Sequence, residues 1–202
     1  MFGFFKGKPS QDEIIKRYEL NIFNNIDLTA RKLSIIISDI LTEQKIDVSP
    51  KIISFECMVF LCWITSRTLH RKYNLSRSEI HTIMRKTSIY ILTIFSILRN
   101  RQHDISLKES AKNLITDEVL EQYNKDADNA FAAYHAALSE IQQCIDKTKS
   151  ISFPISRVFI SRVTRHDPNL SAMNSFTIYV LLESLLLDAL TWPVELIELG
   201  SK

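Results

Sequence analysis

The chain has 202 residues, of which 46% are hydrophobic and 24% charged, with a formal net charge of +2. This composition is ordinary for a globular domain, and the small net charge implies no global attraction to acidic partners. Between Lys8 and Leu199 the sequence contains no glycine. Phosphate-cradling loops, dinucleotide-binding turns and the tightest hairpins all favour glycine. The sequence therefore argues against those sites and against a sheet-rich fold.

Residues 1–9 place Phe2, Phe4 and Phe5 close to lysines but lack the apolar run of a signal peptide. We therefore expect a cytoplasmic protein. Exposed aromatic patches usually mark contacts, so we interpret the phenylalanines as an arm packed on the chain itself or on a neighbouring subunit. A weak membrane peg is the alternative interpretation.

The first predicted helical segment runs from about Ser10 to Lys45, with Ser10 as its N-cap and a break at Asn24 and Asn25. Its second half has apolar residues at helical spacing. These are Leu33, Ile36, Ile37 and Ile40.

The second predicted helix starts at Pro50, after the capping residue Ser49, and continues to about Tyr73. Its apolar stretch is shorter than the roughly 20 residues that span a bilayer, and Glu56 interrupts it. A core helix is therefore a better interpretation than a membrane span.

Two capping boxes, Ser76–Glu79 and Ser106–Glu109, predict the starts of later helices, and Thr116 marks a further start. The helix over about 117–147 has a long apolar stripe. That stripe consists of Leu120, Tyr123, Ala127, Phe131, Tyr134, Leu138, Ile141 and Ile145.

Residues 150–167 fit a short helix and fit a strand almost as well, and we favour the helix. Asp167 followed by Pro168 predicts the start of the last long helix, which runs to about Thr191. Long helices with short connections indicate an all-α fold. We expect a single-domain antiparallel helical bundle of about five long helices plus short helical turns.

Two carboxylates fall on predicted core faces. Glu56 shares its side of the helix with Val59 and Trp63, and Glu183 shares its side with Tyr179 and Val180. Buried acids are usually paired, so separate partners are the first interpretation. The candidate partners are Tyr90, Tyr123, Tyr134, Tyr179, His70, Arg67, Arg157, Arg162 and Arg165. A shared polar pocket, which Tyr179 would help to form, is the second, because two acids in a low dielectric make acid–base or ligand sites.

Metal and thiol chemistry have little support in the sequence. No histidine has Glu or Asp three residues before it, as di-metal carboxylate bundles require, so we predict no metal site and no cofactor. The cysteines Cys57, Cys62 and Cys144 form no CxxC motif and are expected to be free thiols in a reducing compartment.

Basic residues gather in one part of the chain. The range 67–101 has eight Lys or Arg and one acid, whereas 102–149 has nine acids and five bases. Arg77, His81 and Arg85 follow at four-residue spacing, with Arg99 further along, and such a ridge could hold phosphates. The plainer interpretation is a solvated basic face with cations near helix C-termini.

The absence of catalytic and cofactor motifs favours a non-enzymatic protein that binds another protein, with a homo-oligomer left open. The first alternative is a phosphate- or nucleic-acid-binding module that uses the basic ridge, although nucleic acid is disfavoured. The second alternative is a small-ligand-binding or enzymatic bundle whose core glutamates line a pocket.

Overall fold

The computed structural model describes residues 10–44, 48–85, 87, 116–147, 153–166 and 176–199. Every regular element in these ranges is helical and none is a strand, which confirms the all-α prediction. Seven α-helices are described from end to end, rather than five long ones. They are α1 (Gln11–Arg17), α2 (Ile26–Glu43), α3 (Pro50–Arg71), α6 (Asp117–Lys147), α7 (Pro154–His166), α8 (Phe176–Asp188) and α9 (Trp192–Leu199).

Shorter helical pieces connect some of these. A π-helical turn, η1 (Tyr18–Phe23), continues α1, and a 3-10 turn, η3 (Ala189–Thr191), joins α8 to α9. Residues 77–85 are also helical. The break predicted at Asn24 and Asn25 is confirmed, because α2 starts immediately after these residues.

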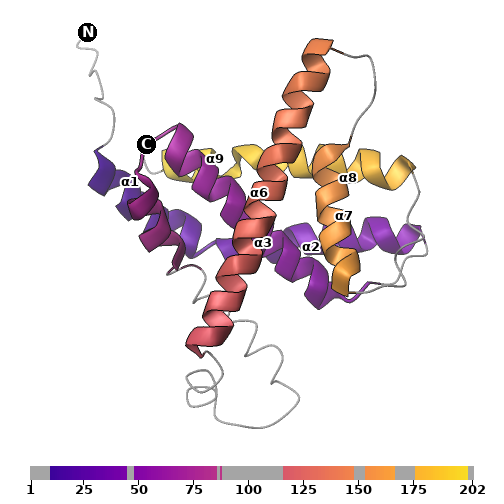
Figure 1. Ribbon diagram of the computed structural model, residues 1–202, viewed down its shortest axis with the longest axis horizontal. Helices are drawn as coiled ribbons and strands as arrows, with labels where there is room; N and C mark the ends of the chain where they lie inside the picture. The colour runs from indigo at the N-terminus through magenta and orange to yellow at the C-terminus, as the bar shows by residue number, and fades with distance from the viewer. Residues whose placement is uncertain are drawn as a thin grey trace.

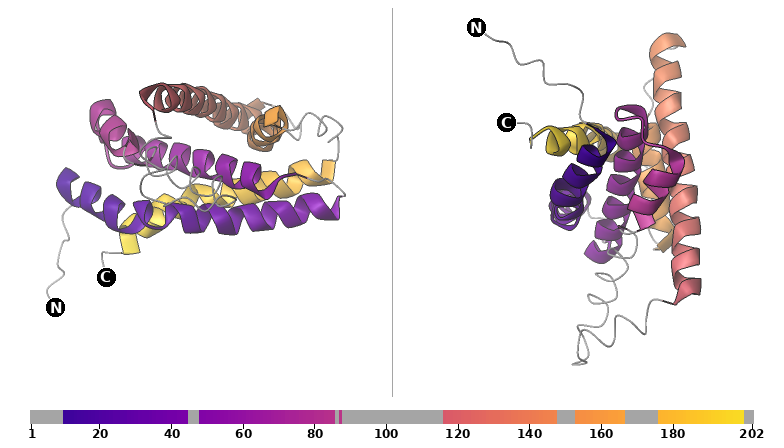
Figure 2. Two further views of the ribbon diagram at one scale, coloured as in Figure 1. Left: turned by 90° about the horizontal axis from the view of Figure 1, so that it is seen from below. Right: turned by 90° about the vertical axis from the view of Figure 1, so that its left-hand side faces the viewer.

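Helix α3 lies at the centre of the structure. It packs against α2, α6, α7 and α9, and Figure 2 shows α6 on one side of it and α2 with α8 on the other. Figure 1 shows that α6 crosses α3 steeply instead of running alongside it. The central position explains why every residue from Glu56 to Thr65 is buried.

The apolar character of α3 also satisfies a membrane criterion. Within the described ranges it is the one helix long and apolar enough to cross a bilayer, and 72% of its 18-residue apolar window is buried inside the fold. A core helix of a soluble protein passes the same test, so the absence of a membrane span stays a prediction.

A second core cluster forms where η1, the end of α3, residues 77–85 and α9 meet. Tyr18 of η1 is 1% exposed, and its hydroxyl is hydrogen-bonded to that of Thr87. Ile22 and Ile197 are buried in the same cluster. This cluster holds residues 77–85 against the rest of the fold.

Several predicted helix starts are confirmed. The hydroxyl of Ser10 accepts a hydrogen bond from the Glu13 amide, and that of Thr116 accepts one from the Val119 amide. Within segment 150–167, the described residues form the favoured helix, α7, and not the alternative strand. Ser49, in contrast, makes no side-chain capping bond, although Pro50 does begin α3.

The predicted core face of α8 needs correction. Val180 was expected inside but is 38% exposed, whereas Ile178, Leu182 and Leu186 are buried. The buried stripe is rotated from the predicted one, because α8 packs between α2 and α7.

Some predictions lie outside the described residues. These are the aromatic arm Phe2, Phe4 and Phe5, the basic residue Arg99, the capping box Ser106–Glu109, the helix start Asp167–Pro168, and the side chain of Cys144.

Candidate anion-binding groove

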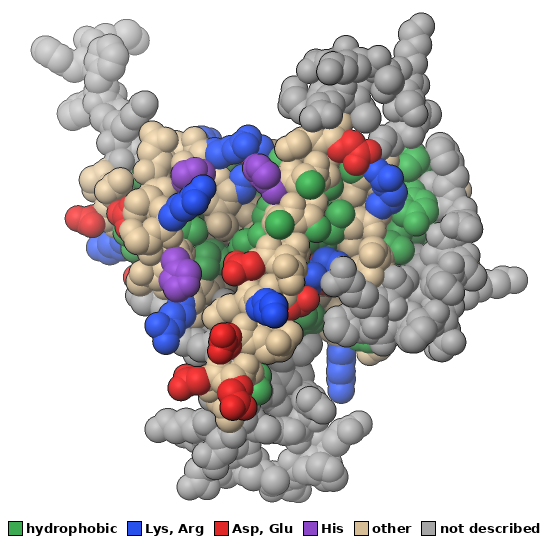
Figure 3. All heavy atoms as spheres, viewed as in Figure 1, with side chains coloured by type: hydrophobic (Ala, Val, Ile, Leu, Met, Phe, Trp, Pro, Cys, Tyr) green, Lys and Arg blue, Asp and Glu red, His purple; other side chains and the backbone are tan. Residues whose placement is uncertain are grey.

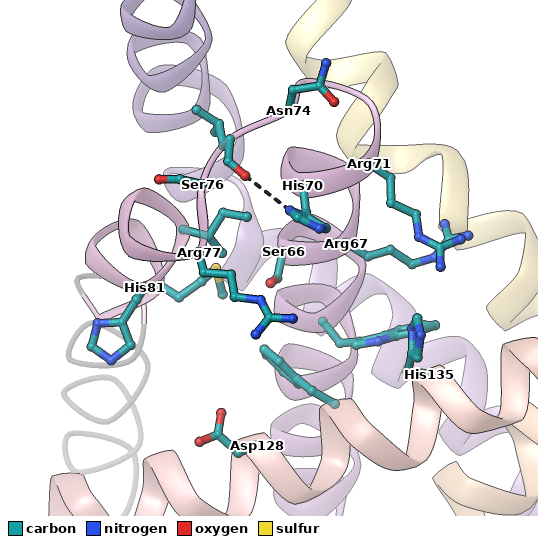
Figure 4. A pocket seen from close by; sticks show the side chains of 15 residues that line it. Ser66, Arg67, His70, Arg71, Asn74, Ser76, Arg77, His81, Asp128 and His135 are labelled. Atoms are coloured by element: carbon teal, nitrogen blue, oxygen red, sulfur yellow. Dashed lines mark hydrogen bonds between the residues drawn. The ribbon is translucent and has the colours of Figure 1, made fainter.

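Three helical segments converge on a groove of about 1050 Å³. Helix α3 supplies residues near its C-terminus, the segment 77–85 faces it, and α6 crosses below both (Figure 4). Each helix contributes residues three or four positions apart, which share one face of a helix. The side chains are Trp63, Ser66, Arg67, His70 and Arg71 from α3, Arg77, Ile80, His81 and Met84 from 77–85, Asp128, Phe131 and His135 from α6, and Asn74, Leu75 and Ser76 from the turn.

The turn between α3 and the segment 77–85 is encoded locally. Asn74 has φ of 56°, a left-handed conformation that asparagine tolerates better than most residues. The Leu75 amide donates to the Leu69 carbonyl over 3.1 Å, which ties the turn back to α3. The predicted capping box then starts the next helix, with the Ser76 amide donating to Glu79 over 2.7 Å and the Glu79 amide to the Ser76 hydroxyl over 3.3 Å.

Three arginines line the groove without a compensating acid. Within the described ranges, none of Arg67, Arg71 and Arg77 forms an ion pair. The Nε atom of Arg67 is buried and has no hydrogen-bond partner among the described residues. Burial and the neighbouring charge of Arg71 lower the pKa of Arg67. The groove therefore holds a concentration of positive charge that no described carboxylate contacts.

The two ends of the groove differ in charge. Figure 4 shows Arg67 and Arg71 reaching to the same side of α3 as His135, with Arg77 pointing inward from the facing helix. Asp128 lies toward the other end, and it is the one acidic side chain among the described residues that line the groove. Figure 3 shows the basic and histidine side chains gathered over this region, with acidic ones along the first turns of α6.

The floor of the groove is apolar. Trp63 is 3% exposed and packs against Tyr134, with 5.2 Å between their ring centroids. Leu75 and Ile80 are buried, and Phe131 is half-buried. Positive charge at the rim and aromatic carbon beneath it suit a ligand that is negatively charged and partly apolar.

The predicted basic ridge is divided by the structure. Arg77 points into the groove (Figure 4), His81 lines both the groove and a smaller neighbouring cavity, and Arg85 lines only that smaller cavity. Arg67 and Arg71 also line the groove, and the sequence did not predict that they would meet Arg77 there. The four-residue spacing of Arg67 and Arg71, followed by the turn at Asn74, was the available signal.

Glu56 belongs to a buried polar network beneath the groove. It accepts hydrogen bonds of 2.7 Å from the Tyr134 hydroxyl and from Nε of Arg162. The other end of that guanidinium contacts Asp126 through a 2.7 Å bond from Nη2. The side chains of Arg162 and Glu56 are only 5% and 2% exposed, so water does not screen this pair.

Burial raises the pKa of Glu56 to about 7, although Arg162 and Tyr134 act in the opposite direction. The loss of hydration therefore outweighs two favourable contacts. Burial also raises the pKa of the Cys57 and Cys62 thiols, which are free as predicted. These thiols are protonated at neutral pH and are poor nucleophiles.

Glu183 has a different role and different partners. Its two carboxylate oxygens accept from the backbone amides of Ile155 over 3.3 Å and Ser156 over 2.6 Å, at the first turn of α7. A carboxylate there satisfies amides that have no partner within the helix and complements the helix dipole. Tyr179, also a predicted site residue, stacks on Phe153 with 6.4 Å between centroids. Neither Glu56 nor Glu183 lines the groove.

Within the part of the chain that the structure describes, no group of three or more His, Cys, Asp or Glu side chains is placed to hold a metal ion. No known family model matches the sequence, and neither a curated protein nor a solved structure matches it. The chemistry of the groove is therefore the available evidence for function.

Proposed function

We propose that the protein is a non-enzymatic binding protein whose groove holds an anion of the phosphate class. The observation that carries this proposal is the set of three arginines on two helices with no described acidic partner, one of them with a buried and unpartnered Nε atom. Guanidinium groups recognise phosphate oxygens through paired hydrogen bonds. A bound phosphate would supply both the missing acceptor and the missing negative charge.

Calorimetric titration of the purified full-length chain with inorganic pyrophosphate tests the proposal. We expect saturable binding that weakens as NaCl is raised, and at least a tenfold loss of affinity in Arg67→Gln/Arg71→Gln. Lys51→Gln removes a positive charge from the exposed first turn of the same helix, and it should bind as the unaltered chain does. Absence of binding at millimolar pyrophosphate, or equal losses in both variants, would contradict the proposal.

A protein partner remains the second candidate, and one surface favours it. Leu28, Ile35 and Ile36 are 50%, 60% and 47% exposed on α2, opposite its buried stripe. Exposed apolar side chains that gather on one helix face are typical of contact surfaces. Cross-linking of the chain with cell extract, compared with Ile35→Glu, tests this candidate through loss of a specific adduct.

We also propose that the chain works as one domain in the form of an antiparallel bundle, and that the cytoplasm is its location. The packing of α2 with α3 and of α6 with α7, both connected in sequence order, supports the first point. Free buried thiols are typical of a reducing compartment and support the second.

A further inference from the structure

The groove is larger and more apolar than an inorganic anion requires. Its volume of about 1050 Å³ is that of a site for a small organic molecule. Trp63, Leu75 and Phe131 line the same space as the arginines. An inorganic phosphate would neutralise the charge but would leave the half-buried side chains of Met84 and Phe131 facing water. The lining therefore matches an anion joined to an apolar or planar body.

A small cavity of about 80 Å³ adjoins the groove. The two lie side by side and share four lining residues: His81, Met84, Asp128 and Phe131. Tyr123 and Cys62 complete the aromatic and sulfur-containing wall of the smaller cavity. Aromatic rings and polarisable sulfur pack favourably against the face or edge of a planar ring.

Polar side chains in the small cavity favour a ligand with a heterocyclic ring over a ligand with an alkyl chain. Asn124 and Asp128 both line the small cavity. An alkyl chain would remove water from these groups and return no hydrogen bond, which is unfavourable. A heterocyclic base with an amino group would donate to the Asp128 carboxylate and exchange hydrogen bonds with the Asn124 amide.

The charges also set the direction of the ligand. The Asp128 carboxylate repels phosphate, whereas Arg67 and Arg71, toward the other end of the groove, attract it (Figure 4). An anion with a neutral, donor-bearing ring is satisfied in only one orientation. We infer that the groove binds a nucleoside phosphate, with its phosphates at Arg67 and Arg71 and its base between Asp128 and Phe131. This inference rests on the proposed binding of a phosphate-class anion.

The test compares five probes by calorimetry on the purified chain: inorganic pyrophosphate, ADP, UDP, dodecyl phosphate and a 20-nucleotide DNA strand. ADP should bind at least tenfold more tightly than pyrophosphate, and more tightly than UDP, whose base lacks an exocyclic amino group. Asp128→Ala removes the acceptor of the amino group, and it should remove most of the advantage of ADP without weakening the binding of pyrophosphate. Asp128 is exposed, so this change should leave the thermal melting curve unaltered.

Each contrary result has a separate meaning. Equal affinities for ADP and pyrophosphate would overturn the nucleoside assignment and leave the proposed anion binding in place. Tighter binding of dodecyl phosphate than of ADP would assign the apolar lining to an alkyl chain. Binding of a 20-nucleotide DNA strand without binding of ADP would assign the site to nucleic acid. Failure of all probes would remove both the inference and the proposed function.

Discussion

Arg162 and Arg67 place the same functional group in opposite surroundings. Arg162 is buried and bonded to two carboxylates, whereas Arg67 lines the groove with its Nε atom unpartnered among the described residues. A fully paired buried charge contributes to holding helices together. A charge left without a partner contributes little to the fold and remains available to a ligand. Arg162 therefore has a structural role, whereas we assign Arg67 to ligand binding.

The largest expected effect is from Arg162→Leu. It leaves Glu56 buried without its cationic partner and breaks the connection to Asp126, so we expect a loss of about 3 kcal/mol or more in the free energy of unfolding. Urea denaturation followed by circular dichroism measures it. Arg157→Leu, on the same helix, breaks an exposed pair with Glu140 and should cost less than about 1 kcal/mol. Equal losses of unfolding free energy in the two variants would mean that the buried network stabilises the fold no more than an exposed ion pair does.

The second prediction concerns pH. Since the pKa of Glu56 is about 7 in the folded state and 4.5 ordinarily, the folded chain keeps a proton that the unfolded chain releases between these values. Stability from this group is complete below pH 4.5 and is lost as pH rises to about 7, by at most about 3 kcal/mol. The measurement is the difference in unfolding free energy between the unaltered chain and Glu56→Gln across pH 4.5–8. A difference that stays constant across this range would contradict the prediction, because it would show that the folded-state carboxylate is charged throughout.

Glu183→Ala should cause a smaller loss in the free energy of unfolding than Arg162→Leu. The change leaves the amides of Ile155 and Ser156 without their acceptor at the start of α7, at a cost of about 2 kcal/mol. Amide hydrogen exchange should accelerate in the first turn of α7 before the rest of that helix. Asp188→Ala removes an exposed acid from the same helix as Glu183. It should leave both the free energy of unfolding and the amide exchange rates in α7 unchanged.

Arg67→Gln should change the free energy of unfolding least, in contrast to Arg162→Leu. Relief from the repulsion of Arg71 and from an unpartnered buried Nε offsets the lost interaction with the helix dipole. We expect the unfolding free energy to change by less than about 0.5 kcal/mol, measured by the same urea titration. A loss as large as that of Arg162→Leu would mean that Arg67 is structural.

The sequence predicted burial better than it predicted partners. Helical periodicity alone placed Glu56 and Glu183 inside, and both are buried. Tyr134 and Arg162 were among nine candidate partners, but they lie 78 and 106 residues from Glu56, and only tertiary packing brings them together. Pairs of that kind leave no local signal in the chain.

The partner of Glu183 was missed for a different reason. The candidates were side chains, whereas the structure uses two backbone amides. A signal was present, because α7 begins with Pro154 and the residue before it, Phe153, cannot cap the helix as Ser, Thr, Asp or Asn would. A helix start without a local cap needs an acceptor from elsewhere in the fold.

The groove was predicted only in part, since it needs three helices. Arg77 was identified, but the convergence with Arg67 and Arg71 depends on the left-handed turn at Asn74, and the third wall depends on where α6 crosses. Local spacing indicates which residues share a face of one helix. It carries no information about which face of a distant helix will meet them.

The Asn74 turn also fixes how two walls of the groove are joined. Arg71 and Arg77 sit on either side of a short hydrogen-bonded connection, so their helices are held together at one end. The third wall is α6, where His135 lines the groove and the preceding residue, Tyr134, donates to Glu56. One helix therefore carries both a side chain of the groove and a hydrogen-bond donor to the hidden acid.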